Sequence, residues 1–253
     1  MSFSTFEFQY QDKKYNFNPL LPLDISLCLQ NNTQNPNCYY AENPVFETIC
    51  ADNFIGNVAE GGSCNYQKIT FTPHGNGTHT ECYGHISADK NAIIPNCLNR
   101  FLFFAELISV VPQKINGDEI IFWEQIETKI TSSPEAIILR TLPNLSEKKI
   151  KNYNQTNPPF LDEKVGTKLA EKNITHLLLD LPSLDKEKDE GKLLCHHNFW
   201  QYPNNIRKNA TITELIFVPD SIIDGVYLLN LQVPSMAIDA VPSKPILYVL
   251  KNI

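Results

Sequence analysis

The chain has 253 residues, of which 42% are hydrophobic and 19% are charged, so it is long enough to bury a substantial core. Its net charge of -7 and its pI near 5.4 argue against nucleic-acid binding, which usually requires a basic face. No apolar run approaches the roughly 18 residues that a membrane helix needs. The N-terminus lacks the basic head and apolar centre of a signal peptide, so the sequence predicts a cytoplasmic protein that binds no membrane.

The seven cysteines are scattered along the chain and form no C-x-x-C pair, so the sequence indicates neither a zinc ribbon nor a dithiol redox motif. Reduced thiols agree with the predicted cytoplasmic location. A disulfide among Cys38, Cys50 and Cys64 is the alternative.

The first part of the chain, residues 1–65, is expected to hold a β-hairpin followed by long loops. FEFQYQDKKYNFN alternates apolar and polar residues on either side of a polar turn, which is typical of a hairpin. PLDISLCL is a candidate short strand. Residues 31–65 are rich in Asn, Pro and Gly and indicate a long loop region, which in compact domains is often functional.

Residues 66–253 are expected to form the core that carries the site. YQKITFTPH alternates like a strand, and two apolar runs, 136–142 and 174–181, flank the helical pattern LDEKVGTKLAEKN. A strand, a helix and a second strand in this order predict a parallel pair. Further strands are predicted in ATITELIFVP, GVYLLNLQVP and PILYVLKNI. The fold class is therefore mixed α/β, in a single domain.

The segment TFTPHGNGTHTECYGHIS, residues 70–87, concentrates side chains that bind metals: His74, His79, Glu81 and His85. His79 and Glu81 are two residues apart, so in an extended segment they leave the same face. Imidazole combined with carboxylate suits Zn²⁺, Mn²⁺ or Fe²⁺. A polar loop with locally bonded histidines is the alternative, but three histidines and a glutamate at this spacing favour a metal site.

One local motif supplies too few ligands, so others are expected downstream. In ATITELIFVP, Glu214 shares a strand face with Ile212 and Ile216, where an unpaired carboxylate is costly. A wet strand edge is the alternative for Glu214. LLCHHNFW offers His196 and His197, which point to different sides, so at most one of them is expected to bind metal.

HGNGTHTECYGH resembles the H-x-G-T-H-x-D-x-P-x-H signature of the metal-dependent cyclase family, which includes bacterial kynurenine formamidase and isatin hydrolase. Several ordered motifs resemble the family along most of the chain, which is more specific than one short pattern. The resemblance implies a swivelling β/β/α domain with a mostly β core, assembled as a homodimer or homotetramer. The other matching segments are PLDISLCL, NPPFLDEKVGTKLAEKNITHLLLDLPSLD, LLCHHNFW and ITELIFVPDSIIDGVYLLNLQVP.

The resemblance also implies roles and a reaction. His79, Glu81, His196 and Glu214 match metal ligands for one or two ions, Zn or Mn, and His85 matches the acid/base histidine. The implied reaction is hydrolysis of a small amide by metal-activated water, with an aryl formamide such as N-formylkynurenine or a cyclic amide as substrate. A lactone is the alternative substrate, and a non-catalytic small-molecule-binding protein of the same fold is the alternative function.

The chain departs from the signature at its first histidine, because Gly75 stands in that position and His74 lies one residue earlier. Glycine accommodates a bulge or a positive φ, so Gly75 and Gly77 are expected to let the loop return His74 to the ion. The alternative is that Asn76 or water takes this ligand position. Glu81 also replaces the family's aspartate, and a tyrosine replaces its proline before His85.

Several neighbouring residues are expected to have structural roles. Cys82 is expected to point away from the metal, because the residues on either side of it, at 81 and 83, would face the metal. The LPSLD turn is expected to be braced by its two aspartates. Structural roles are thus predicted for His176, His197, Asp180 and Asp185, and either core packing or a pocket wall for Phe199, Trp200 and Tyr202.

Overall fold

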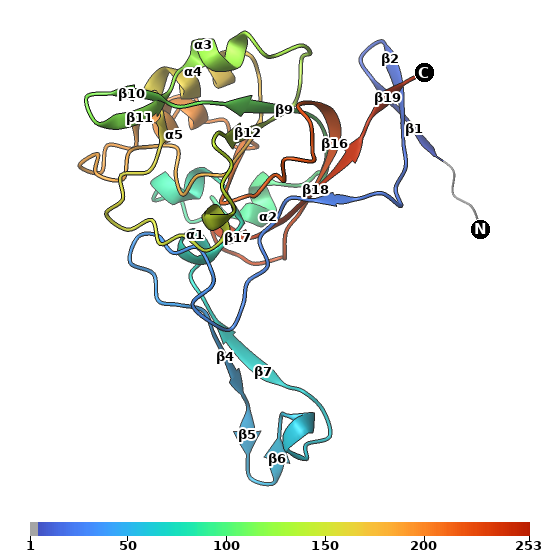
Figure 1. The fold of residues 1–253 in the computed structure, drawn as a ribbon, viewed down its shortest axis with the longest axis vertical. Helices are drawn as coiled ribbons and strands as arrows, with labels where there is room; N and C mark the ends of the chain where they lie inside the picture. The colour runs from blue at the N-terminus through green and yellow to red at the C-terminus, as the bar shows by residue number, and fades with distance from the viewer. Residues whose placement is uncertain (1–4) are drawn as a thin grey trace.

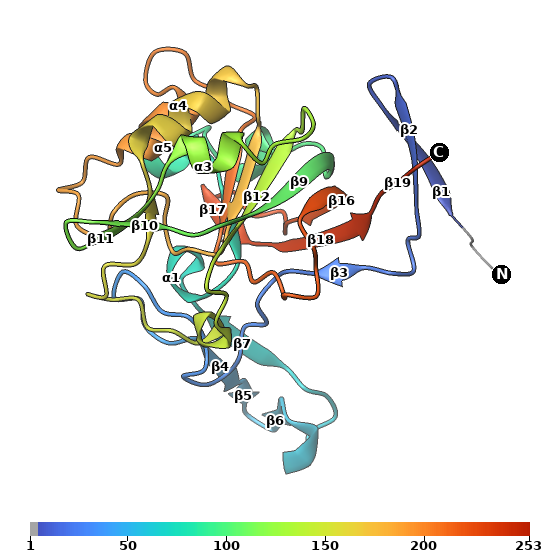
Figure 2. The ribbon, with the colours of Figure 1, turned by 45° about the horizontal axis from the view of Figure 1, so that its top comes forward.

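The computed structural model describes residues 5–253 and is built around one nine-stranded sheet (Figures 1 and 2). Helices cover one face of its central strands, and the predicted mixed α/β class is confirmed. From one edge to the other, the strands are β17 (Ala240–Pro242), β8 (His79–Glu81), β15 (Thr211–Glu214), β14 (His176–Leu179), β12 (Ala136–Thr141), β9 (Leu102–Val110), β16 (Gly225–Gln232), β18 (Lys244–Val249) and β3 (Leu23–Asp24).

The middle of this sheet is parallel, because β9, β12, β14 and β15 all run in one direction. Every residue of β12 and β14 is buried, as expected for parallel strands covered on both faces. The predicted strand–helix–strand unit is confirmed, since the helix α4 (Glu163–Glu171) lies between β12 and β14 in the chain. With α3 (Trp123–Glu127) and α5 (Leu194–Trp200), α4 forms the helical layer (Figure 2).

One edge of the sheet positions the histidine-rich segment. There β8 lies antiparallel between β15 and β17, with His79 opposite Glu214 and Glu81 opposite Ile212. Directly opposed residues of an antiparallel pair point to the same face. The register of β8 on β15 therefore brings the imidazole of His79 to the carboxylate of Glu214, although 135 positions separate them in the numbering (214 minus 79).

The helices α4 and α5 pack closely at Gly166. A Cβ added there would lie 2.4 Å from the backbone oxygen of Cys195 and 2.8 Å from the backbone nitrogen of Phe199. Glycine usually weakens a helix, but at this position its lack of a side chain lets α5 approach. The contact supports the helix that carries His196.

We expect Gly166→Ala to destabilise the protein by about 1–3 kcal/mol, because the added methyl group overpacks the α4–α5 contact. At an exposed helical site the same change would stabilise by about 1 kcal/mol. Denaturant unfolding of the metal-free variant measures the effect, with Lys164→Ala on the exposed face of α4 as the control. A Gly166→Ala variant as stable as the parent would contradict the close packing.

Two parts of the chain differ from the expectations. Residues 45–70, within and beyond the expected loop, form a hairpin arm that extends away from the body (Figure 1). Its strands carry mostly exposed residues. Residues 67–70 lie within YQKITFTPH, where a strand is predicted, whereas residues 45–55 lie in the region expected to be loop. The elements of the arm are β4 (Val45–Thr48), β5 (Cys50–Ala51), β6 (Phe54–Ile55), η1 (Val58–Glu60) and β7 (Gln67–Thr70).

The second difference is β9, the longest strand, which lies in the middle of the sheet and is absent from the predicted strands. It carries Glu106 and Ser109 inside an otherwise apolar run, which weakens the sequence pattern. The Glu106 carboxylate accepts hydrogen bonds from the backbone N–H and hydroxyl groups of Thr131 and Ser132, so it is satisfied in the core.

The remaining elements surround the sheet. The predicted N-terminal hairpin is confirmed, and it pairs with the last strand of the chain. PLDISLCL contributes only the two residues of β3, and LLCHHNFW forms α5. Among the described residues, no helix is long and apolar enough to cross a membrane. The other bounds are β1 (Phe6–Tyr10), β2 (Lys13–Phe17), α1 (Pro73–Asn76), η2 (Tyr83–Ile86), α2 (Ile94–Cys97), β10 (Gln113–Ile115), β11 (Asp118–Ile121), η3 (Ser146–Lys149), β13 (Phe160–Leu161) and β19 (Lys251–Asn252).

Candidate metal centre

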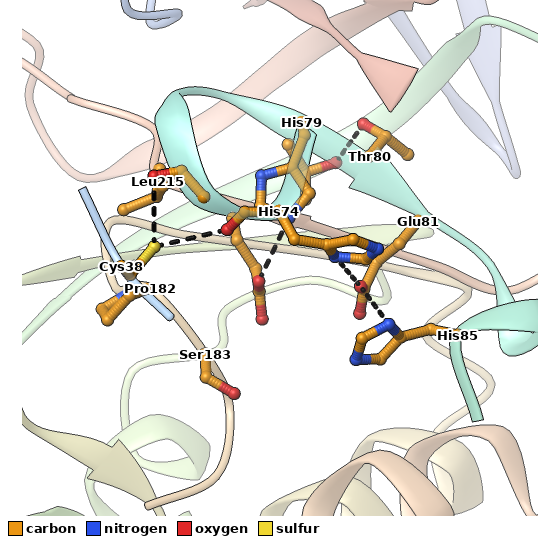
Figure 3. A network of polar contacts seen from close by, with 12 residues as sticks. Cys38, His74, His79, Thr80, Glu81, His85, Pro182, Ser183 and Leu215 are labelled. Carbon is orange, nitrogen blue, oxygen red and sulfur yellow. Dashed lines mark hydrogen bonds and ion pairs between the residues drawn. The ribbon is translucent and has the colours of Figure 1, made fainter. Parts of the chain in front are cut away.

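The predicted site residues meet at the edge where β8 pairs with β15. The side chains of His74, His79, Glu81 and His85 turn toward one another in Figure 3. His79 and Glu81 come from β8 itself, and His85 comes from η2 directly after it. Two further side chains enter from distant segments: His196 from α5 and Glu214 from the end of β15.

The distances show how closely these groups approach. His79 Nε2 lies 3.3 Å from Glu214 Oε2, and His196 Nε2 lies 3.3 Å from Glu81 Oε1 and 3.8 Å from Glu214 Oε1. His74 Nδ1 lies 3.2 Å from Glu81 Oε2. All of the expected ligands therefore surround one small volume. Their binding of a metal stays a prediction.

The polar atoms at the centre of this cluster test whether a cation fits. His79 Nε2, both carboxylate oxygens of Glu81 and Glu214 Oε1 are buried without a hydrogen-bond partner among the described residues. A buried polar group without a partner is costly, and a buried carboxylate is especially so. Nitrogen and oxygen ligands of this kind suit Zn²⁺ or Mn²⁺. The donor set and its unsatisfied atoms thus fit a divalent cation.

Two of the histidines are held in place through their second ring nitrogen. His79 Nδ1 lies 2.9 Å from the backbone oxygen of Gly77, and His196 Nδ1 lies 2.5 Å from Asp185 Oδ2. Such contacts orient a ligating imidazole and determine which nitrogen faces the metal. Asp185 also accepts the backbone N–H groups of Cys195 and His196, so it does more than the expected bracing of a turn.

His74 reaches the cluster, but not by the expected route. Neither Gly75 nor Gly77 has a left-handed backbone, and Gly77 is extended; residues Pro73–Asn76 instead form one helical turn, α1, which takes up the extra residue. Gly75 is needed for close approach, since a Cβ there would lie 2.2 Å from Cβ of Ala41.

The alternative occupant of this ligand position, Asn76, is used elsewhere. Its side-chain oxygen accepts from the backbone N–H of Thr72, and its NH₂ group donates to the backbone oxygen of Glu42. Both ends of the amide are therefore bonded to the backbone. His74, whose ring nitrogen lies beside Glu81, is the better candidate.

His85 lies farther from its nearest carboxylate oxygen than the other three histidines of the cluster lie from theirs. Its Nδ1 is 3.7 Å from Glu81 Oε2 and 3.8 Å from Asp239 Oδ2, and 28% of its side chain is exposed. It lines a cavity of about 330 Å³ together with Tyr39, Leu193 and three members of the cluster, His74, His196 and Glu214. This volume lies within the range typical of small-molecule sites. His85 thus stands between the cluster and the space for a ligand.

The carboxylates and histidines of the cluster stabilise each other's charged forms. Burial favours the neutral ring of His196, but its hydrogen bond to Asp185 and the charge of Glu81 outweigh burial and raise the pKa of His196 to about 10. Burial likewise opposes protonation of His74, but Asp239 and Glu81 raise its pKa to about 10. Burial opposes ionisation of Glu81, yet the nearby His85 and His196 hold its pKa well below the usual range. A cation would have to displace these protons, so binding should compete with acid.

Sequence reasoning missed two residues of the site, Asp239 and Tyr39. Asp239 Oδ2 lies 3.3 Å from His74 Nε2, and Tyr39 lines the cavity from the loop before the arm. Neither belongs to a periodic pattern or a motif with known ligand spacing. Asp239 lies directly before β17, so only the pairing of β17 with β8 places it here.

The residues expected to be structural are mostly in the core. His176 Nδ1 bonds the Thr211 hydroxyl, and His197 Nδ1 lies 3.5 Å from the backbone oxygen of Tyr202 rather than facing the cluster. A hydrogen bond with Cys97 and burial raise the pKa of the Cys82 thiol. All seven cysteines are free. The buried core members are Cys82, Phe199 and Trp200, with Tyr202 packed against them, while Asp180 accepts from Thr141 and Lys148.

Comparisons with known proteins agree with this geometry. A protein-family model described as "Putative cyclase" matches residues 23–186. The chain belongs to the Putative cyclase family. The expectation of a hydrolase enzyme of this family is confirmed, since the curated relatives that it matches are enzymes of that class.

Relatives of the family that resemble this chain include two named kynurenine formamidase. That of Bacillus cytotoxicus is 24% identical over 189 residues, which cover 74% of this chain and 82% of the relative. That of Bacillus cereus is 27% identical over 170 residues, which cover 67% and 73%.

Solved structures share the fold. A predicted metal-dependent hydrolase from Bacillus stearothermophilus aligns with a TM-score of 0.64 at 17% identity, covering 90% of this chain and 98% of that one. Isatin hydrolase A from Labrenzia aggregata, bound to benzyl benzoate, aligns with a TM-score of 0.66 at 14% identity, covering 91% and 94%. At these identities the likeness shows the cyclase fold of the chain.

Proposed function

We propose that the chain is a metal-dependent hydrolase that cleaves the amide bond of a small aryl formamide, with N-formylkynurenine as the leading candidate. One observation carries the proposal: unsatisfied buried atoms of histidines and carboxylates converge beneath a cavity of about 330 Å³. The relatives named kynurenine formamidase support the choice of substrate. The proposed ligands of the Zn or Mn ion are His74, His79, Glu81, His196 and Glu214.

The chemistry divides between the cation and the protein. A bound divalent cation supplies a water molecule with a pKa lowered toward about 7 and polarises a carbonyl oxygen. His85, beside the cluster and partly exposed to the cavity, carries a proton to the leaving nitrogen as the C–N bond breaks. Imidazole suits this role because its ordinary pKa is near neutrality. No nucleophilic cysteine or serine takes part.

The walls of the cavity carry apolar groups beside polar and charged side chains, so they suit a substrate with an apolar part and a polar part. Tyr39 presents an aromatic ring and Leu193 an aliphatic side chain, while Ser183 adds a hydroxyl. An aromatic ring can pack on such walls while its formamide group reaches the histidines. Tyr39 is also held in a left-handed backbone conformation, with φ of 53°, and its hydroxyl lies 3.4 Å from the backbone oxygen of Pro182.

A hydrolysis screen tests the proposal. Protein freed of metal by a chelator is assayed against aryl formamides, lactams and lactones, before and after addition of Zn²⁺ or Mn²⁺. We expect aryl formamide hydrolysis only after metal is added, with metal bound in stoichiometric amount. Hydrolysis of lactones alone would overturn the substrate assignment. Metal binding without any hydrolysis would favour a binding protein, and activity unaffected by the chelator would overturn the metal mechanism.

A further inference from the structure

His74 lies between two carboxylates. Its Nδ1 is 3.2 Å from Glu81 Oε2 on the inner side, and its Nε2 is 3.3 Å from Asp239 Oδ2 on the outer side. The His74 and Asp239 side chains are 26% and 30% exposed, whereas Glu81 is buried. One nitrogen of the ring therefore faces the cluster, and the other faces a carboxylate at the rim.

This arrangement repeats what the structure does at the other two histidines. The second nitrogen of His79 faces the backbone oxygen of Gly77, and that of His196 faces Asp185. In each case an oxygen lies where it can accept one ring N–H, so that the other ring nitrogen, once a cation has displaced its proton, directs its lone pair at the cluster. Asp239 occupies the corresponding place for His74, whose own backbone lies in a helical turn rather than a strand.

The backbone holds Asp239 firmly in this place. Its carbonyl oxygen accepts the N–H of Cys82 at 3.0 Å, and the next residue, Ala240, pairs with Glu81 across β17 and β8. Gly84 leaves room for it, since a Cβ there would lie 2.9 Å from Cβ of Asp239. The backbone of Asp239 thus belongs to the same ladder that carries Glu81, so the point from which its carboxylate reaches His74 is fixed relative to the cluster.

We propose that Asp239 is a positioning residue that holds the His74 ring for the cation. Its carboxylate accepts the Nε2–H of His74, which leaves the Nδ1 lone pair directed toward Glu81 and His79. The inference rests on the proposed metal site and explains how a histidine one residue out of place can still serve. The other polar contact of the ring is Glu81 on the inner side, so without Asp239 the outer nitrogen, Nε2, loses the carboxylate that holds it.

Asp239 also lies 3.8 Å from His85 Nδ1, so the experiment has to separate the two histidines. An Asp239 that acts through His85 changes turnover and its pH profile but leaves metal affinity intact. An Asp239 that acts through His74 changes metal affinity, and it does so only while His74 is present. A merely electrostatic effect of its charge would persist without His74.

The test measures Zn²⁺ affinity by competition with a chromogenic chelator, in the parent and in Asp239→Ala and Asp239→Asn. We expect Asp239→Ala to weaken affinity about 10- to 100-fold, the usual effect of removing a partner of a ligating histidine. Asp239→Asn should recover part of the loss, because its amide oxygen can still accept the ring N–H. In a His74→Ala background, the further change Asp239→Ala should have no effect.

Two control variants accompany the test, and the results that would contradict the proposal can be told apart. Asp185→Ala, which frees His196, should weaken affinity to a similar degree, and Asp12→Ala at the exposed hairpin turn should not. Unfolding of the metal-free variants checks their folding. Parent-like affinity of Asp239→Ala, or an equal loss in the His74→Ala background, would overturn the role of Asp239. A parent protein that binds no Zn²⁺ would instead overturn the proposed function itself.

Discussion

We expect His85→Ala to lower turnover by about 10²- to 10⁴-fold while leaving bound metal unchanged, because the ring is the proton carrier and not a ligand. The structure supports this division of roles. His85 stands 3.7 Å from the nearest oxygen of Glu81, while His74 and His196 approach the same carboxylate to 3.2 and 3.3 Å. Turnover of the aryl formamide and metal content by mass spectrometry check the two halves of the prediction.

His197→Ala is the matched control for His85→Ala. His197 follows the proposed ligand His196 directly, but its ring packs against Tyr202 with centroids 5.5 Å apart. We expect this variant to keep both its metal and its turnover. Loss of metal from His85→Ala would show that His85 is a ligand and would contradict its assignment as acid and base.

The largest effect on metal binding is expected for Glu81→Gln. Glu81 is buried at the centre of the cluster, within 3.7 Å of His74, His85 and His196. Removing a partner outside the ligand set costs about 10- to 100-fold in affinity, so removal of this charged ligand should cost more than about 100-fold. Calorimetric titration of the metal-free protein with Zn²⁺ measures the loss.

Glu81→Gln should also lower the free energy of unfolding of the metal-free protein. The raised pKa values of His74 and His196 stabilise the fold below their unfolded value near 6.5, and this contribution disappears as the pH rises toward about 10. Without the Glu81 charge, the stability below pH 6.5 should fall. Glu47→Gln, which removes an exposed carboxylate paired with Lys68 on the arm, is the control. Parent-like Zn²⁺ affinity of Glu81→Gln would contradict a ligand role.

The local part of the site follows from short-range rules. His79 and Glu81 share a face because side chains alternate along a strand, and both are found on β8 with that orientation. Glu214, whose place on an apolar strand face predicts a partner or a metal, is buried, with one oxygen near His79 and the other without a hydrogen-bond partner. The strand–helix–strand unit around α4 is likewise predictable from the sequence, because its apolar strand runs and its amphipathic helix lie within one continuous segment.

Other features lack a periodic signal that could be recognised. The arm of residues 45–70 is held by pairing of its own strands, and its side chains are mostly exposed, so apart from the alternation in YQKITFTPH its sequence carries no hydrophobic pattern. The turn that returns His74 to the cluster looked like a glycine-dependent bulge. It is a helical turn, and the glycine at 75 serves close packing instead.

The residue types, their spacing and the free-energy cost of burying a carboxylate are therefore enough to indicate the chemistry of the cluster and most of its members. The sheet register had to come from the fold, because pairing between β8, β15 and β17 joins segments far apart in the sequence. That register sets His79 against Glu214 and brings Asp239 to His74. Pairing of distant strands depends on the packing of the whole core. The residues around Asp239 therefore contain no local pattern that predicts the pairing of β17 with β8.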